Sequence, residues 1–538
     1  MPKASDIIEA GSGGVETTYK DLAWIDSRRN DPGWDLNPRF RNGTLEGYLI
    51  WLTFPSPIPR QPSSDMHRIS LTTLLMATIA GTATADGWLQ FRGPNGTGVA
   101  VGDQPLPTEI GPDSYVIWKT ALPPGHSSPV VTADRIYLTA VKDEQLWTIG
   151  LDRSSGEIVW EAETPHSGLE KIHAIGSHAQ PSPATDSELV VSFFGSSGLV
   201  CHDRDGSHVW RRKLGPFKNT YGAASSPIIV DDIVLLNQDH DEGSFLLALD
   251  KATGETKWKV GREEFPRGFS TPIVWNNAGR KQAVVVGALR AIGYDLKTGT
   301  EVWTVRGLAR ITAATPVAAA NGMLYIAEWA PGADAGGRIQ AEPFEDITAK
   351  VDKNENGTIE FDELGVGPLK IRFPQIDRDK DDRITKAEYE WMRNIFHTAQ
   401  NVLMAVEPGG EGDITDTHVK WTQPRYVPYV PSPLYHDGMV LMVKDGGIVT
   451  SHDAETGEMT KRGRVPKTGN YYSSPVVGDG KVYLLSQRGG LTVLSAEPDW
   501  QVLHKADFDE ETFATPALVD GRIYLRTEKH LYCFGLAE

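Results

Sequence analysis

Cysteine is scarce in this sequence. Only Cys201 and Cys533 occur among 538 residues, and neither a Cys-x-x-Cys motif nor a Cys-Cys pair is present. This excludes a disulfide framework, a cysteine-based zinc cluster and a haem attachment site. Basic residues are also few, because 53 Lys and Arg face 71 Asp and Glu and leave a net charge of −18. That balance argues against nucleic-acid binding as a main role and suits a soluble exported protein that binds cations.

Long apolar runs are missing as well. A mostly apolar run over residues 69–80 follows Met66-His67-Arg68 and precedes Ala83-Thr84-Ala85. This is the pattern of a secretory signal peptide with its cleavage site, so we predict a signal peptide over 66–85 and export to the periplasm or the medium. The run is well short of the roughly 20 residues that span a membrane, and we expect no membrane span. Residues 1–65 fit no repeat, and we interpret them as a non-native upstream extension or a disordered segment.

Two 12-residue segments, 352–363 and 377–388, share one pattern of oxygen-bearing residues. Positions 1, 3, 5 and 12 supply side-chain oxygens, position 7 a backbone carbonyl and position 9 a further oxygen, which is the arrangement of an EF-hand calcium loop. We therefore predict two calcium sites. The ligands expected in the first loop are Asp352, Asn354, Asn356, Thr358, Glu360 and Glu363, and those in the second are Asp377, Asp379, Asp381, Arg383, Thr385 and Glu388.

The second loop departs from the pattern at position 6, where Asp382 replaces glycine. That turn needs a left-handed backbone, which Asp tolerates better than most residues, so we expect weaker binding there. Short helices are predicted to flank the loops at 343–351, 361–364 and 385–398. The alternative, a pair of solvated acidic turns, is disfavoured because both segments share their phasing and carry Ile at position 8.

Ser-Pro or Thr-Pro pairs recur through the rest of the chain, and most are followed by an apolar strand and a turn. Five of the seven steps between them measure 41–45 residues, one measures 54 and one measures 117. Four short strands per unit at a period near 44 are typical of propeller blades. Eight starts therefore predict an all-β fold, an eight-bladed β-propeller. The pairs begin at Ser128, Ser182, Ser226, Thr271, Thr315, Ser432, Ser474 and Thr515.

The repeats end on a shared pattern, seen in Asp250, Gly254 and Trp258. Gly supplies the positive φ of a tight turn and Asp accepts bonds from turn amides. We interpret the Trp residues as structural, each packing over the next blade. The last blade lacks an outer strand, and residues 115–119 precede the first blade, so the ring is predicted to close by joining the two ends of the chain.

The 117-residue step contains about 73 residues beyond one blade, and both acidic loops lie within it. We therefore predict that the propeller occupies 86–329 and 401–538, and that an α-helical EF-hand pair at 330–400 is inserted in blade five. Strands alternate in direction within a blade, so the insertion is expected on the face that carries the blade-to-blade connections, beside the central channel.

The Ser/Thr-Pro starts and the Asp, Gly and Trp ends resemble the pyrroloquinoline quinone (PQQ)-like repeat family. Residues 88–96 resemble the mature N-terminus of its exported bacterial members, and the insertion resembles calmodulin-type EF-hands. The family includes quinoprotein dehydrogenases, an outer-membrane assembly scaffold and many binders, so its fold leaves function open. Alcohol-oxidising members hold PQQ with a calcium ion, a Trp floor and adjacent cysteines.

The missing Cys-Cys pair and haem motif favour a non-catalytic binding or scaffold module, with a PQQ-dependent alcohol or sugar dehydrogenase as the alternative and PQQ as its cofactor. The expected partner is a protein, peptide or polysaccharide on a loop face, and the protein is expected to be a monomer. We assign no catalytic residue.

Three weaker groups of residues complete the sequence-based predictions. A histidine group between blades one and two is interpreted as surface histidines, with metal ligands as the alternative. Residues 239–242 are interpreted as a polar turn, with a cation site as the alternative. A third group precedes Ser/Thr-Pro starts and is predicted at the channel mouth. The histidines are His166, His173 and His178, and the mouth residues are Tyr221, Arg267, Tyr471, Tyr472 and Phe513.

Overall fold

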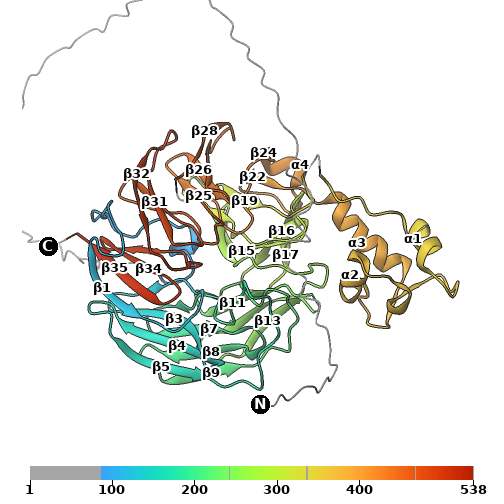
Figure 1. Cartoon of the computed structure of the whole chain (residues 1–538), viewed down its shortest axis with the longest axis horizontal. Helices are drawn as coiled ribbons and strands as arrows, with labels where there is room; N and C mark the ends of the chain where they lie inside the picture. The colour runs from blue at the N-terminus through green and yellow to red at the C-terminus, as the bar shows by residue number, and fades with distance from the viewer. Residues whose placement is uncertain (1–86, 242, 335–336, 467, 537–538) are drawn as a thin grey trace, which may run out of the picture. The chain divides into compact units, whose positions relative to one another are not determined.

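The computed structural model describes residues 87–538 except 242, 335–336, 467 and 537–538. The predicted signal peptide and the segment 1–65 lie outside these residues. The described chain forms eight sheets arranged as blades around an axis, seven of four antiparallel strands and one that adds a short parallel fifth strand (Figure 1). The predicted eight-bladed propeller is thus confirmed. Within the described ranges, no helix is long and apolar enough to cross a bilayer.

The first four blades follow one another along the chain. Blade one contains β2 (Val130–Val131), β3 (Arg135–Lys142), β4 (Gln145–Asp152) and β5 (Ile158–Thr164). Blade two contains β6 (Ala184–Thr185), β7 (Leu189–Phe193), β8 (Leu199–Asp203) and β9 (His208–Arg212). Blade three contains β10 (Ile228–Val230), β11 (Ile233–Gln238), β12 (Phe245–Asp250) and β13 (Thr256–Gly261). Blade four contains β14 (Ile273–Asn277), β15 (Arg280–Gly287), β16 (Arg290–Asp295), β17 (Glu301–Arg306) and the distant β23 (Gly412–Asp413).

The last four blades include the interrupted one and the closing one. Blade five contains β18 (Val317–Ala318), β19 (Leu324–Glu328), β22 (Val402–Val406) and β24 (Val419–Gln423). Blade six contains β25 (Leu434–His436), β26 (Met439–Lys444), β27 (Ile448–Asp453) and β28 (Met459–Arg464). Blade seven contains β29 (Val476–Gly478), β30 (Lys481–Leu485), β31 (Gly490–Ser495) and β32 (Val502–Asp507). Blade eight contains β33 (Ala517–Val519), β34 (Arg522–Arg526), β35 (His530–Gly535) and β1 (Val116–Ala121).

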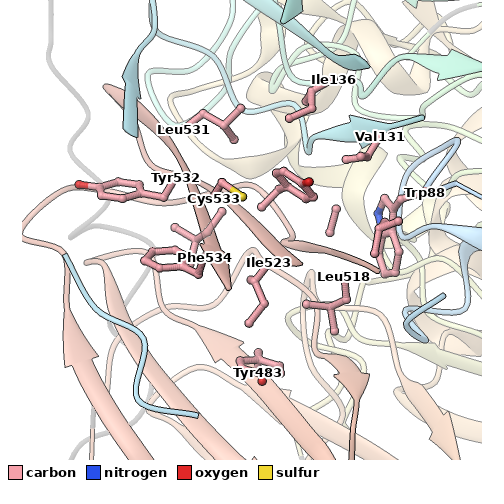
Figure 2. Packing of buried hydrophobic residues seen from close by; sticks show 14 of the residues in the cluster. Trp88, Val131, Ile136, Tyr483, Leu518, Ile523, Leu531, Tyr532, Cys533 and Phe534 are labelled. Carbon is pink, nitrogen blue, oxygen red and sulfur yellow. The ribbon is translucent and has the colours of Figure 1, made fainter. Parts of the chain in front are cut away.

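The two ends of the described chain close the ring inside blade eight. β1 pairs antiparallel with β35, and the register places Trp118 opposite Cys533. Figure 2 shows the apolar cluster at this closure, where Trp88 and Val131 approach side chains of blade eight such as Leu518. The closure predicted from the missing outer strand is confirmed. β1 covers the edge of β35, which would otherwise stay unpaired.

The recurring Ser and Thr residues before proline form a belt of hydrogen bonds around the axis. In seven of the eight blade-to-blade steps, the backbone N–H of one such residue donates to the side-chain hydroxyl of its counterpart in the next blade, at 2.9–3.0 Å. The last of these bonds joins Thr515 to Ser128 and so links the ends of the ring. Proline has no backbone N–H. The Ser or Thr before it therefore supplies both the N–H that donates to one neighbouring blade and the hydroxyl that accepts from the other.

We expect Thr515→Val to destabilise the propeller by roughly 1–3 kcal/mol. The substitution keeps the shape of the side chain but removes the hydroxyl that accepts the buried Ser474 N–H at 3.0 Å. Urea denaturation measures the loss. Thr422→Val, at an exposed position of β24, is the matched control and should stay within about 0.5 kcal/mol. Equal effects of the two substitutions would show that the belt does not stabilise the ring.

The Trp of the outer strand docks onto the next blade, as predicted. Trp210 donates from its indole nitrogen to the Lys251 carbonyl at 2.8 Å and covers the turn glycine Gly254, where a Cβ would stand 2.7 Å from the ring. The same contact recurs for Trp118, Trp160, Trp258 and Trp421. Trp303 instead bonds Gln282 of its own blade, because blade five lacks the Asp and Gly turn that would receive it.

The segment before β1 runs across the ends of the innermost strands. Its carbonyl, amide and side-chain groups make hydrogen bonds to six of the eight blades, so it ties the ring together on the face away from the Ser/Thr-Pro starts. The contacts join Trp88 to Val131, Leu89 to Thr185, Asn95 to Val274, Arg92 to Pro433, Gly98 and Ala100 to Val477, and Val101 to Leu518.

Between β19 and β22 the chain leaves blade five and forms helices. These are α1 (Phe344–Val351), the 3-10 helix η4 (Phe361–Glu363), α2 (Pro368–Ile376) and α3 (Lys386–Thr398). Three agree with the predicted segments within one residue, but the sequence prediction was wrong to omit α2. Pro374 lies inside α2 and obscures its helical pattern, and the helix is held by the burial of Phe373 and Ile376. A further short helix, α4 (Thr415–His418), precedes β24.

Candidate functional site

The first acidic loop, residues 352–363, turns its side-chain oxygens onto its own backbone. Asp352 accepts the N–H groups of Asn356 and Gly357 at 3.2 and 2.9 Å, and Gly357 has a φ of 82°. Asn354 and Asn356 donate their amides to the Glu360 carboxylate at 3.0 and 2.9 Å. These contacts link four of the predicted ligands around one turn. Thr358 stands beside them and donates to the Asn356 oxygen.

The carboxylate at the end of the first loop reaches back to its beginning. Glu363 is only 8% exposed and accepts the Lys353 N–H at 2.9 Å and the Glu360 N–H at 3.0 Å. A buried carboxylate that returns to the first turn of its loop draws both ends of the loop together. It can supply two oxygens to a cation held there.

The second acidic loop, residues 377–388, brings three carboxylates together. One oxygen from each of Asp377, Asp379 and Glu388 lies within 4.8 Å of the others. Burial raises the pKa of Asp377. Burial also acts against the Glu388 carboxylate, but hydrogen bonds from Thr385 and Arg378 outweigh it and lower the pKa of Glu388. A cluster of hard oxygen donors at this spacing suits calcium better than a transition metal.

The remaining positions of the second loop also have the expected local geometry. Asp381 accepts the Arg383 N–H at 3.0 Å, and Asp382 has a φ of 66°, the left-handed conformation expected at the position where glycine is usual. Thr385 caps α3 in a reciprocal pair with Glu388. The Arg383 side chain is exposed and lies 3.7 Å from Glu360 of the first loop, so only its carbonyl is suited to bind a cation.

The two loops are joined by a short antiparallel sheet. β20 (Ile359–Glu360) pairs with β21 (Arg383–Ile384), and the register places Ile359 opposite Ile384. Both isoleucines are buried in an apolar cluster with residues of α1, α2 and α3. Each is position 8 of its loop, so the shared Ile in the sequence reflects a shared packing role.

The insertion contacts the loops of blades three and four, whereas the sequence placed it beside the central channel. Gln375 of α2 donates to the Asp241 carboxylate at 3.2 Å, and Leu289 of blade four joins the apolar cluster of the insertion. Arg338 donates to the His397 carbonyl at 3.1 Å, which ties the segment before α1 to α3. The acidic loops therefore stand on a supported helical unit beside the rim of blades three and four.

The weaker groups of residues make hydrogen bonds and ion pairs within the described chain. The three histidines contact separate carbonyls or amides, with His166 on Glu144, His178 on Glu170 and His173 on the Ile175 N–H. In the turn 239–241, Asp239 pairs with buried Arg262 and Asp241 pairs with Arg267, while Glu242 lies outside the described residues.

Not every predicted channel-mouth residue is accessible. Tyr471 is 1% exposed and lies in the apolar cluster of blades six and seven, so its placement at the mouth was wrong. Tyr221 and Tyr472 are half-buried and contact Phe269 and Phe513 respectively.

The two cysteines lie in the third strands of blades two and eight. Cys201 and Cys533 are buried, and burial raises the pKa of each thiol to about 12. Neither is suited to thiolate chemistry.

A cavity of about 450 Å³ was not signalled by any sequence motif. It lies on the opposite face, where the N-terminal segment meets blades three, four and five, and its lining includes Gln90, Asn95 and Trp275. Its walls come from residues far apart in the chain, so only the assembled ring reveals it.

The described residues define a class: an eight-bladed β-propeller with an inserted helical unit that bears paired acidic loops. Residues 93–224 and 151–328 match the family model described as outer membrane protein assembly factor BamB. The chain is thus similar to this family over residues 93–328, which is less than half of its length. No curated protein matches the chain.

Among solved structures, the chain is similar to two kinds of propeller. BamB from Moraxella catarrhalis is 13% identical with a TM-score of 0.48, over 78% of this chain and 98% of that one. The quinohemoprotein alcohol dehydrogenase from Comamonas testosteroni is 12% identical with a TM-score of 0.50, over 85% of this chain and 82% of that one. Identities this low relate the fold alone.

Proposed function

We propose that this protein is an exported, calcium-binding β-propeller that acts as a binding or scaffold module and is not an enzyme. The clustering of Asp377, Asp379 and Glu388 oxygens within 4.8 Å is the observation that carries the calcium part. The match to the BamB family model supports the scaffold part. Export rests on the signal-peptide pattern of residues 66–85.

The chemistry of the donors supports calcium over other cations. Each loop offers only carboxylate, amide, carbonyl and hydroxyl oxygens, which are hard donors that bind six- to eight-coordinate calcium well. In the first loop the donors are Asp352, Asn354, Asn356, the Thr358 carbonyl, Glu360 and Glu363. In the second they are Asp377, Asp379, Asp381, the Arg383 carbonyl, Thr385 and Glu388.

A structural role for calcium fits the position of the loops. The insertion contacts the propeller through a few residues, such as Gln375 on Asp241, while the blades close through their own belt of hydrogen bonds. Calcium would therefore order the inserted helices and leave the ring intact. The insertion would then present a defined surface on the loop face, where we expect a protein, peptide or polysaccharide partner.

Calorimetric titration of calcium into the purified, chelator-treated protein tests this proposal. We expect two binding events per monomer, with the second loop weaker because Asp382 occupies its glycine position. Titration of PQQ into the calcium-loaded protein is the companion measurement, and we expect no binding. Absence of calcium binding would contradict the metal assignment. Tight one-to-one binding of PQQ, followed by reduction of a dye acceptor, would instead establish the dehydrogenase alternative.

A further inference from the structure

Two arginines converge where the insertion meets the propeller. Arg310 lies in the connection between blades four and five, and Arg372 lies in α2 of the insertion. Their guanidinium carbons stand 5.4 and 5.1 Å from the ring centre of Phe396 in α3. Both cations therefore approach one aromatic ring, although one comes from the propeller and the other from the insertion.

Neither arginine is neutralised by a carboxylate of the described chain. Arg310 donates from Nε and Nη2 to the Pro331 carbonyl at 3.2 and 3.0 Å. Arg372 contacts the Phe396 ring and makes no hydrogen bond or ion pair to any described residue. The neighbouring Arg267 differs, because Asp241 accepts two bonds of 3.0 Å from its guanidinium.

The environment of the two cations is costly for positive charge. Burial and, to a smaller extent, the charge of Arg372 together lower the pKa of Arg310 to about 10. Burial and the charge of Arg267 lower the pKa of Arg372. Both side chains stay protonated at neutral pH, so like charges share a half-buried space. In a protein with a net charge of −18, acidic side chains are plentiful, yet none of the described ones pairs with either arginine.

Aromatic hydroxyls complete the surroundings. Tyr221 and Tyr429 lie near Arg310, and both precede Ser/Thr-Pro starts on the same face. A phenol can donate a hydrogen bond to an anion, and the guanidinium fork matches the two oxygens of a carboxylate or phosphate.

We propose that Arg310, Arg372 and Phe396 form an oxyanion-binding site, which takes the carboxylate or phosphate group of a small ligand at the joint between insertion and propeller. The arginines supply charge and guanidinium N–H donors, and the Phe396 ring packs against both guanidinium groups. Because one arginine belongs to the propeller and the other to the insertion, a bound anion joins the two parts.

Calorimetric titration of the full-length protein with succinate and with sulfate tests the proposal at low ionic strength, where charge interactions are least screened. We expect saturable binding of at least one probe with a dissociation constant of about 1 mM. Preference for succinate identifies a carboxylate ligand, and preference for sulfate identifies a phosphate-like one. The titration is run with calcium and with chelator, so failure of calcium binding and failure of the anion site give separate results.

Single variants show whether the arginines are the binding groups. Arg310→Gln and Arg372→Gln should each lower the affinity for the anion at least about tenfold. Arg280→Gln is the control, because this substitution makes the same change in net charge. Arg280 is exposed and pairs with Glu411 on the protein surface. Arg372→Lys keeps the charge but loses the planar fork, and it should bind more weakly than the native protein and more tightly than Arg372→Gln. No saturable binding of either probe, or equal weakening by Arg280→Gln, would overturn the proposal.

Discussion

Glu363→Gln combined with Glu388→Gln is expected to abolish the helix formation that calcium induces in the insertion. Each glutamate is at most 9% exposed and closes its loop by returning to the first turn. Glutamine removes one anionic oxygen from each site, so calcium affinity should fall at least about tenfold per site, or about 1.4 kcal/mol. Circular dichroism with and without calcium, together with calcium calorimetry, measures both effects.

The matched control is Glu355→Gln combined with Asp362→Asn. Both residues are exposed members of the first loop outside the ligand positions, and the pair makes the same change in net charge. It should leave calcium binding close to that of the native protein. If the glutamate variant kept its calcium affinity and its calcium-induced dichroism, the ligand assignment would be wrong. The β-sheet signal should survive in every variant, because the blades close without the insertion.

Arg262→Ala should produce the largest loss of stability in the propeller, about 3–5 kcal/mol. The side chains of Arg262 and Asp239 are both 0% exposed, and the guanidinium donates to the two carboxylate oxygens at 2.8 and 2.9 Å. It also donates to the Tyr294 hydroxyl at 2.5 Å, which links blade three to blade four. Removing the arginine leaves the Asp239 charge buried without a counterion. The free energy of unfolding in urea measures the cost.

Lys281→Ala is the control for the buried pair. Lys281 lies 3.2 Å from Asp231, but the two side chains are 61% and 62% exposed, so water screens their attraction. Its loss should cost less than about 1 kcal/mol. Similar losses in the two variants would mean that removal of Arg262 does not leave a costly buried charge on Asp239, and the expectation would be wrong.

Much of the fold was predictable because a propeller repeats a local pattern. The Ser/Thr-Pro starts, the turn that holds Asp250 and Gly254, and the docking Trp258 each act within one blade or on its neighbour. Because each blade needs the same short-range contacts, the same residue types recur in the sequence at a regular spacing. The exception, Trp303, lies where the repeat is interrupted, and its changed partner follows from the missing turn. The omitted helix α2 shows where prediction from local sequence fails. Pro374 interrupts its helical sequence pattern, but burial of its apolar side chains in the folded protein still stabilises the helix.

The sequence by itself determined the number of blades, the closure by strands from both ends and the spacing of oxygen donors in the acidic loops. These features depend on residues close together in the chain or on a regular repeat. Only the tertiary structure decided which Ser and Thr hydroxyls meet across the blades and that one N-terminal segment bonds to six blades. It also brought Arg310 and Arg372 to the same ring, since side chains 62 positions apart become neighbours only when the insertion packs on the propeller.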